Sequence, residues 1–220
     1  MKLYGYFRSS AAYRVRIALN LKGLAYDHVG VHLVNNGGEQ HGSAYRSLNA
    51  SALVPTLVDG DLVLGQSLAI LAYLEEAYPD APPLLPTDVA TRAHARAFAA
   101  AIACDIHPLN NLRVLNYLNQ PLGVEAAQKS AWYGHWITLG FHALEAQLAR
   151  HGSGNFCFGD APGLADCCLI PQVYNALRFH VDLNAYPHIG RIYEHCHTLD
   201  AFIHAAPENQ PDAVQQGEPK

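Results

Sequence analysis

The sequence predicts a small α/β domain followed by an all-helical domain. Over residues 1–80, short segments rich in β-forming residues alternate with helical patterns, as in a layered α/β domain. Residues 78–88 then carry four prolines in eleven positions, which is typical of a linker. From residue 89 to residue 206, Ala/Leu-rich segments of helical period follow. Half of the 220 residues are apolar, which is enough for two small hydrophobic cores.

The first thirty-odd residues predict two strands joined by a helix. Residues 2–7 (KLYGYF) are rich in β formers and make the first strand. Ser9-Ser10 is a helix-entry signal, the helical pattern covers residues 11–22, and Gly23 ends it. Residues 25–34 alternate as a second strand. The handedness of such a β-α-β unit makes its two strands parallel.

Residues 35–78 predict a loop, a hairpin and a helix. Residues 35–51 are polar and rich in glycine, as in a loop with one irregular helical turn. Two short apolar runs flank Asp59-Gly60, a dipeptide favoured in tight hairpins. Gln66-Ser67 then opens a helix that ends before Pro79.

The predicted domain limits follow from these elements. Residues 1–80 form the α/β domain, residues 79–87 the linker and residues 88–210 the helical domain. Residues 207–220 are polar and contain proline, and we expect a loosely held tail there. Breaks within the helical domain are expected near Pro108, at residues 121–123, over residues 151–163, and at Pro187.

Composition excludes several classes of function. The net charge is −5 and there is no Lys/Arg-rich block, so a nucleic-acid partner is not expected. The N-terminus has no apolar region of signal-peptide length and no segment reaches the length of a membrane span, so we expect a cytosolic protein without a membrane partner. The five cysteines form no C-x-x-C pair, which favours buried, reduced thiols over disulfides or a zinc ribbon.

Metal and nucleotide sites are not expected either. The thirteen histidines include no H-E-x-x-H pattern, and His195 and His197 would lie on different faces of a helix. The glycines of residues 152–163 lack the Lys-Ser/Thr of a phosphate-binding loop. Small organic molecules are therefore the expected ligands.

Four segments, in the same order, carry a resemblance to a known family. They are RSSAAYRVRIALNLKG (8–23), LVPTLVDGDLVLGQSLAILAYLEE (53–76), DIHPLNNLRVL (105–115) and GLADCCLIPQVYNALRFHVDL (163–183). The chain resembles the cytosolic glutathione transferases, and within them the zeta class, which includes maleylacetoacetate and maleylpyruvate isomerases. The resemblance spans nearly the whole chain. It implies a thioredoxin-like N-terminal domain, an all-α C-terminal domain, glutathione as cofactor and a homodimer.

The resemblance assigns thiolate stabilisation to Ser9, with Ser10 in support. A thiol of pKa ~8.5 is only a few per cent ionised at neutral pH, so an enzyme that uses glutathione must stabilise its anion. Hydroxyl donors at a helix N-terminus can do this. From the residues alone, both serines could equally be ordinary helix caps.

Further residues are implied to bind glutathione. Val54-Pro55 is implied to have a cis peptide bond and to pair, like a strand, with the cysteinyl unit; an ordinary trans turn proline is the alternative. Gln66-Ser67 is implied to bind the γ-glutamyl carboxylate, because a helix N-terminus attracts anions. Gln40 completes the implied set within one chain. His107 is implied to reach glutathione across the dimer interface, although a structural histidine is an equal alternative.

The resemblance implies that Arg113 and Arg178 face an acidic substrate, since a guanidinium matches a carboxylate. Arg8, beside the expected thiolate, is a candidate catalytic and substrate-binding residue, and a surface cation near a strand end is the alternative. The implied reaction is glutathione-dependent cis–trans isomerisation of a maleyl dicarboxylate, either maleylacetoacetate or maleylpyruvate, in aromatic compound degradation. A general transferase that conjugates electrophiles such as α-halo acids is one alternative. A non-catalytic glutathione-binding module is another.

The chain departs from the family pattern at three places. Ala11 stands where the zeta class usually has a cysteine, so no chemistry of that thiol is expected. Gly163 replaces the usual Ser or Thr three residues before Asp166, and we expect Asp166 to bond the backbone N–H of Gly163 in a purely structural role. The usual Asn-Pro before the Val-Pro segment is Asn49-Ala50.

Overall fold

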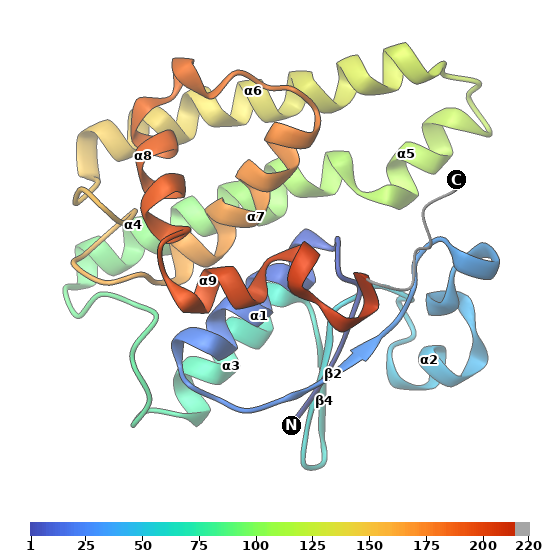
Figure 1. Cartoon of the computed structure of the whole chain (residues 1–220), viewed down its shortest axis with the longest axis horizontal. Helices are drawn as coiled ribbons and strands as arrows, with labels where there is room; N and C mark the ends of the chain where they lie inside the picture. The colour runs from blue at the N-terminus through green and yellow to red at the C-terminus, as the bar shows by residue number, and fades with distance from the viewer. Residues whose placement is uncertain (214–220) are drawn as a thin grey trace. The chain divides into compact units, whose positions relative to one another are not determined.

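The computed structural model describes residues 1–213, which form two compact units. The first unit contains residues 1–84 and 197–213, and the second contains residues 85–196. Figure 1 shows the elements of both units, coloured by residue number. Within the part of the chain described, no helix is both long and apolar enough to cross a membrane.

A four-stranded mixed sheet lies at the centre of the first unit. Its strands are β1 (Lys2–Gly5), β2 (Asp27–Gly30), β3 (Thr56–Asp59) and β4 (Leu62–Gly65), in the order β2-β1-β3-β4. β1 and β2 are parallel, as the β-α-β prediction requires, and β3 is antiparallel to β1 and β4. The predicted hairpin forms at Asp59-Gly60, where Gly60 has a φ of +58° that favours glycine.

Three helices of the first unit are α1 (Ser10–Leu21), α3 (Ser67–Ala77) and α9 (Asp200–Ala205), and α1 contacts the other two. Nine of the twelve residues of α1 are buried, including two arginines, so this helix contributes to the core of the unit. The region between β2 and β3 holds the 3₁₀ turns η1 (Asn35–Gly37) and η2 (Glu39–His41), followed by the short helix α2 (Ser43–Leu48).

The second unit is helical throughout, as predicted. Its elements are α4 (Val89–Ala100), the π-helical η3 (Ala101–Ile106), the 3₁₀ η4 (His107–Asn110), α5 (Leu112–Asn119), α6 (Ala126–His151), α7 (Leu164–Arg178), the 3₁₀ η5 (Leu183–Ala185) and α8 (Pro187–Cys196). The four predicted breaks all fall at or between the ends of these helices. The central helix is α7, because its residues 165–173 are all buried.

Asp166 holds the start of α7. Its Oδ2 accepts the N–H of Gly163 at 2.9 Å, and its Oδ1 accepts the N–H of Cys157 at 2.9 Å. The side chain is 1 % exposed, so a carboxylate here serves two backbone donors that would otherwise be buried without partners. The predicted structural role of Asp166 is confirmed.

Three expectations differ from the structure. The predicted helical domain ran to residue 210, but residues 197–213 belong to the first unit. Residues 207–213 are not a loose tail: they form the 3₁₀ turns η6 (Pro207–Asn209) and η7 (Pro211–Ala213), which belong to the first unit, because side chains of this segment bond the backbone. Residues 214–220 lie outside the described residues. Four cysteines are buried as expected, but Cys104 is exposed.

Candidate functional site

The register of the sheet gathers the predicted N-terminal site residues at one edge. Tyr4 pairs with Thr56, and Thr56 pairs with Gly65, so the end of β1, the start of β3 and the end of β4 lie in one row. The residues just beyond this row include Ser9, Val54-Pro55 and Gln66-Ser67. Three segments that are far apart in sequence therefore meet at one sheet edge, each presenting backbone or hydroxyl groups.

Ser9 is the N-cap of α1. It has an extended φ and ψ of −69° and 116°, and its Oγ accepts the N–H of Ala12 at 3.2 Å. Because the oxygen is used as an acceptor, the hydroxyl proton can be donated to an anion in front of the helix. The N-terminus of α1 adds its partial positive charge at the same place. Ser9 is partly exposed whereas Ser10 is buried, so Ser9 is the accessible hydroxyl.

Arg8 lies beside Ser9 on the β1–α1 loop. Its guanidinium carbon is 4.9 Å from the centroid of the Phe7 ring, a cation–π arrangement. The side chain is partly exposed, in contrast to Arg14 and Arg16 on α1. Arg8 is thus a cation next to the accessible hydroxyl.

Ser67 is the first residue of α3 and is 6 % exposed. Arg14 donates from Nη1 to its Oγ at 3.2 Å, so the serine hydroxyl accepts from a buried cation and keeps its own proton for a ligand. A helix N-terminus, a hydroxyl and a buried guanidinium together favour a carboxylate at this position. The preceding residue, Gln66, has a φ of +66°, a conformation that non-glycine residues rarely adopt and that occurs preferentially at ligand sites.

Val54-Pro55 has the predicted cis peptide bond. The sheet pairing of β3 begins at Thr56, so Val54 lies just outside the ladder, where its backbone N–H and C=O can pair with an extended ligand. Asn49 holds the approach to this position, because its Nδ2 donates to the carbonyl of Leu53 and to Thr56 Oγ1, both at 3.0 Å. The departure at Ala50 therefore leaves the anchoring role of Asn49 intact.

Gln40 lies on η2, in the segment that follows β2, and is 7 % exposed. Its Nε2 is 3.2 Å from Nε2 of His41, and among residues 1–213 its Oε1 has no hydrogen-bond partner. A buried amide oxygen without a partner is costly unless a ligand or water supplies the donor. Because β2 runs parallel to β1, this segment leaves the sheet at the edge where Ser9 lies.

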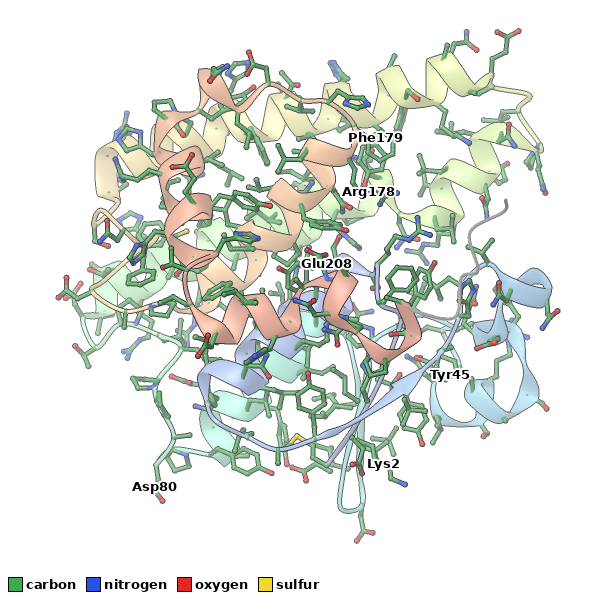
Figure 2. The ribbon with its side chains drawn as sticks, viewed as in Figure 1. Lys2, Tyr45, Asp80, Arg178, Phe179 and Glu208 are labelled. Carbon is green, nitrogen blue, oxygen red and sulfur yellow. The ribbon has the colours of Figure 1, made fainter. Side chains whose placement is uncertain are left out.

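The helical unit carries the other three predicted residues. Arg178 is the last residue of α7, and its guanidinium carbon is 5.8 Å from the centroid of the Phe179 ring. Figure 2 labels both residues. Phe179 in turn stacks on Tyr133 with centroids 3.6 Å apart. Burial raises the pKa of Tyr133 to about 12, while the charge of Arg178 opposes the increase. Arg178 is therefore an exposed cation beside an aromatic pair.

His107 and Arg113 lie near each other in sequence. His107 begins η4 and is partly exposed. Arg113 is exposed in the first turn of α5, where Asn111 caps the helix by accepting its backbone N–H at 3.1 Å. The guanidinium of Arg113 can therefore bind an anion without first leaving a buried position.

Comparisons with known proteins show the family to which the chain belongs. Residues 3–82 match the family model described as "Glutathione S-transferase, N-terminal domain". The chain is 55 % identical to a probable maleylacetoacetate isomerase of Vibrio cholerae over 96 % of this chain and 97 % of that one. It also matches a solved maleylpyruvate isomerase, described as a bacterial glutathione transferase of the zeta class, with a TM-score of 0.93. The two chains are 50 % identical, and the match covers 97 % of this chain and 100 % of that one. The chain belongs to the zeta class of glutathione transferases.

A third relative was solved with two ligands bound. It is the maleylacetoacetate isomerase of Methylobacterium extorquens AM1, solved with bound malonate and glutathione. This structure has a TM-score of 0.92 and is 43 % identical, over 97 % of the present chain and 99 % of its own. Both ligands carry carboxylates, the charge type that a helix N-terminus and arginines accept.

Membership of the zeta class confirms the predicted fold, and the structure adds two contacts that sequence reasoning missed. One is the hydrogen bond from Arg14 to Ser67, and the other is the pairing of Arg16 with the backbone of Phe7 and Ala205. The sequence feature that could have indicated these contacts is the pair of arginines at positions 14 and 16 inside a largely apolar helix. A charge placed in a core helix predicts a specific buried partner.

Proposed function

We propose that this zeta-class protein catalyses the glutathione-dependent cis–trans isomerisation of a maleyl dicarboxylate, maleylacetoacetate or maleylpyruvate. The observation that carries the proposal is the meeting of Ser9, Val54 and Ser67 at one sheet edge, in a chain that shares about half its residues with maleylacetoacetate and maleylpyruvate isomerases. Each of the three positions offers a group that one part of glutathione requires. Ser9 offers a hydroxyl to the thiol, and Val54 offers backbone N–H and C=O groups to the cysteinyl unit. Ser67 offers a hydroxyl at a helix N-terminus to the γ-glutamyl carboxylate.

Glutathione, when bound, supplies a thiolate that adds to the C=C bond of the substrate, permits rotation about the resulting single bond, and is expelled as the trans double bond forms. Ser9 keeps the thiol ionised by donating its hydroxyl proton, and Ser10 supports the same helix end. Val54 fixes the cysteinyl backbone by strand-like pairing, so the sulfur stays in front of Ser9. Gln66-Ser67 holds the γ-glutamyl carboxylate, and Gln40 supplies a further polar contact.

In this proposal the three arginines interact with the substrate. Arg8, next to Ser9, stabilises the negative charge that develops on the substrate when the thiolate adds. Arg113 and Arg178 bind the carboxylates. Their exposure and the aromatic pair beside Arg178 support such a role. A conjugating transferase for neutral electrophiles would need no such set of cations.

The proposal extends to the assembly and place of action. We expect a homodimer in which His107 contacts the partner's glutathione, working in the cytosol in the degradation of an aromatic compound. The resemblance of residues 105–115 to the family supports the role of His107. Light scattering that gives the mass of one 24.0 kDa chain would contradict the dimer.

Steady-state kinetics of three variants, Arg8→Ala, Arg113→Ala and Arg178→Ala, test the assignment. Each is assayed with maleylpyruvate and with a neutral chloro-aromatic electrophile. Loss of one charged hydrogen-bond partner typically costs ~1.5–3 kcal/mol, or roughly ten- to a hundredfold. We expect Arg8→Ala to lower kcat for maleylpyruvate, and the other two variants mainly to raise its KM.

Arg96→Ala is the matched control, because Arg96 is an exposed arginine on α4 that has no predicted role. It should behave as wild type with both substrates. Equal losses on the charged and neutral substrates would show that the three arginines maintain the fold instead of binding carboxylates. A wild-type protein that turns over the chloro-aromatic compound but neither maleyl substrate would favour the general transferase.

A further inference from the structure

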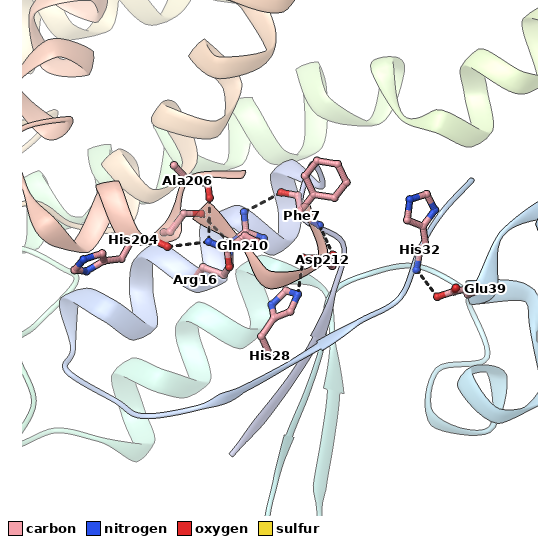
Figure 3. Close-up of polar contacts among 10 residues, drawn as sticks. Phe7, Arg16, His28, His32, Glu39, His204, Ala206, Gln210 and Asp212 are labelled. Atoms are coloured by element: carbon pink, nitrogen blue, oxygen red, sulfur yellow. Dashed lines mark hydrogen bonds and ion pairs between the residues drawn. The ribbon is translucent and has the colours of Figure 1, made fainter. Parts of the chain in front are cut away.

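The C-terminal segment of the first unit holds the loop that carries Ser9. Asp212, on η7, accepts the backbone N–H of Phe7 with its Oδ2 at 2.9 Å. Phe7 precedes Arg8 and Ser9 on the β1–α1 loop. Figure 3 shows this bond among the polar contacts between the segment and the loop. More than 200 positions of sequence separate the two residues.

The other side of the same residue is held as well. Arg16 donates from Nη2 to the carbonyl oxygen of Phe7 at 3.0 Å, and from Nε to the carbonyl oxygen of Ala205 at 2.8 Å. The Arg16 side chain is fully buried, and burial lowers its pKa to about 10, which leaves it charged at neutral pH. Both backbone groups of Phe7 are thus bonded to charged side chains. The N–H bonds Asp212 of the C-terminal segment, and the C=O bonds Arg16, which in turn bonds Ala205 of that segment.

Asp212 is itself fixed in place. Its Oδ1 lies 3.0 Å from Nε2 of His28 on β2, and the two side chains are only 12 % and 8 % exposed. The contacts with His28 and with Phe7 N–H lower the pKa of Asp212 despite the opposing effect of burial, so the acceptor is a carboxylate at neutral pH. Gly30 permits the close packing, because a Cβ there would lie 3.2 Å from Asp212 Cβ.

We propose that Asp212 is a positioning residue for thiol activation, acting through the peptide N–H of Phe7 to fix where the Ser9 hydroxyl stands. The inference rests on the proposed function, in which Ser9 stabilises the thiolate. The short link between the two residues supports it: Ser9 N–H bonds the carbonyl of Tyr6 at 2.9 Å, so Phe7 lies inside the turn that ends at Ser9. A displacement of Phe7 would therefore also displace Ser9. Misplacement of a catalytic group by about 1 Å can cost up to about a hundredfold in rate.

The test compares Asp212→Ala with Asp212→Asn. Alanine removes the acceptor for Phe7 N–H, whereas asparagine keeps a carbonyl oxygen for it and a polar amide group beside His28. Glu208→Gln is the matched control, because it removes one negative charge from the same segment at an exposed position. The measurements are kcat per glutathione-binding site, with sites counted by calorimetry, and the ultraviolet titration of the bound thiolate.

We expect Asp212→Ala to lower kcat per site about tenfold or more and to raise the pH at which the bound thiol ionises. The dissociation constant of glutathione should change little at acid pH, where the bound thiol is protonated. Asp212→Asn should recover most of both properties, and Glu208→Gln should equal wild type. Counting only sites that bind glutathione removes unfolded protein from the comparison.

Asp212→Ala that keeps wild-type kcat per site and thiolate titration would overturn the proposal and leave Asp212 a purely structural residue. An Asp212→Asn variant as impaired as Asp212→Ala would also overturn it, because the acceptor for Phe7 would then not be what matters. If wild type itself binds no glutathione or shows no thiolate band, the proposed function has failed, which is a different result.

Discussion

Replacement of Ser9 tests the centre of the proposed chemistry, because one hydroxyl has two separable duties there. Its oxygen caps α1 by accepting Ala12 N–H at 3.2 Å, and its proton is available to the thiolate. Losing an N-cap to alanine costs ~1 kcal/mol of stability, but losing it to glycine costs only a few tenths. Losing a hydrogen bond to an anion costs ~1.5–3 kcal/mol, which corresponds to a thiol pKa about one to two units higher.

Three variants separate these duties. Ser9→Ala and Ser9→Gly both lack the hydroxyl, so both should lose roughly ten- to a hundredfold in kcat at neutral pH. Only Ser9→Ala should also lose ~1 kcal/mol in the free energy of unfolding, measured with urea. Ser9→Thr keeps both the cap and the proton and should stay close to wild type. The loss of kcat should shrink at alkaline pH, where the thiol ionises unaided.

The assay is the ultraviolet absorbance of the bound thiolate against pH, read beside kcat on the same samples. Two results would contradict this role of Ser9: wild-type turnover in Ser9→Gly, or identical titration of the bound thiol in wild type and Ser9→Ala. In either case Ser9 is only a helix cap, and thiolate stabilisation must come from another group.

Two further predictions concern the first unit. Ser67→Ala should weaken glutathione binding about tenfold in calorimetry and leave kcat at saturating glutathione nearly unchanged, because the γ-glutamyl carboxylate lies away from the reacting carbon; a fall in kcat alone would contradict this. Hydrogen bonds from Tyr78 and Tyr73 lower the pKa of Asp59 in the folded protein. Ionised Asp59 therefore stabilises the fold at pH values above the pKa of the unfolded chain, ~3.9, and this stabilisation is lost as the pH falls toward the lower pKa of the folded protein. Urea unfolding of Asp59→Asn across this acid range should therefore show a smaller loss of stability on acidification than wild type, and an equal loss would refute the role of Asp59.

Local signals in the sequence were sufficient to predict most of the elements. The Asp59-Gly60 turn needs a residue that tolerates positive φ, and Gly60 supplies it. Gly23, with a φ of +64°, ends α1 for the same reason. Ser9 caps α1 as predicted, and Gly163 bonds Asp166 as predicted. In each case the determinant lies within a few residues of the feature, so a single sequence contains it.

The candidate site was predictable only in part, because its geometry depends on distant partners. The segments at Ser9, Val54 and Ser67 could be named from the family resemblance, but their meeting at one edge depends on the order and register of the strands. The bond from Arg14 to Ser67 spans 53 positions and has no local signature. Residues 207–213 have the polar, proline-bearing composition of a tail, yet Gln210 and Asp212 bond backbone groups within the first unit.

The placement of sulfur in the chain also bears on which reactions the site supports. Burial raises the pKa of the thiols of Cys157, Cys167 and Cys196, so these remain neutral in the core. A cysteine at position 11 would stand in the first turn of α1, where the helix N-terminus favours the thiolate, but Ala11 occupies that position. The proposed site therefore stabilises the thiolate of glutathione, not that of a protein cysteine. Addition and expulsion of one thiolate need only that sulfur, whereas disulfide exchange needs a second one beside it, so Ala11 favours isomerisation and conjugation over redox chemistry.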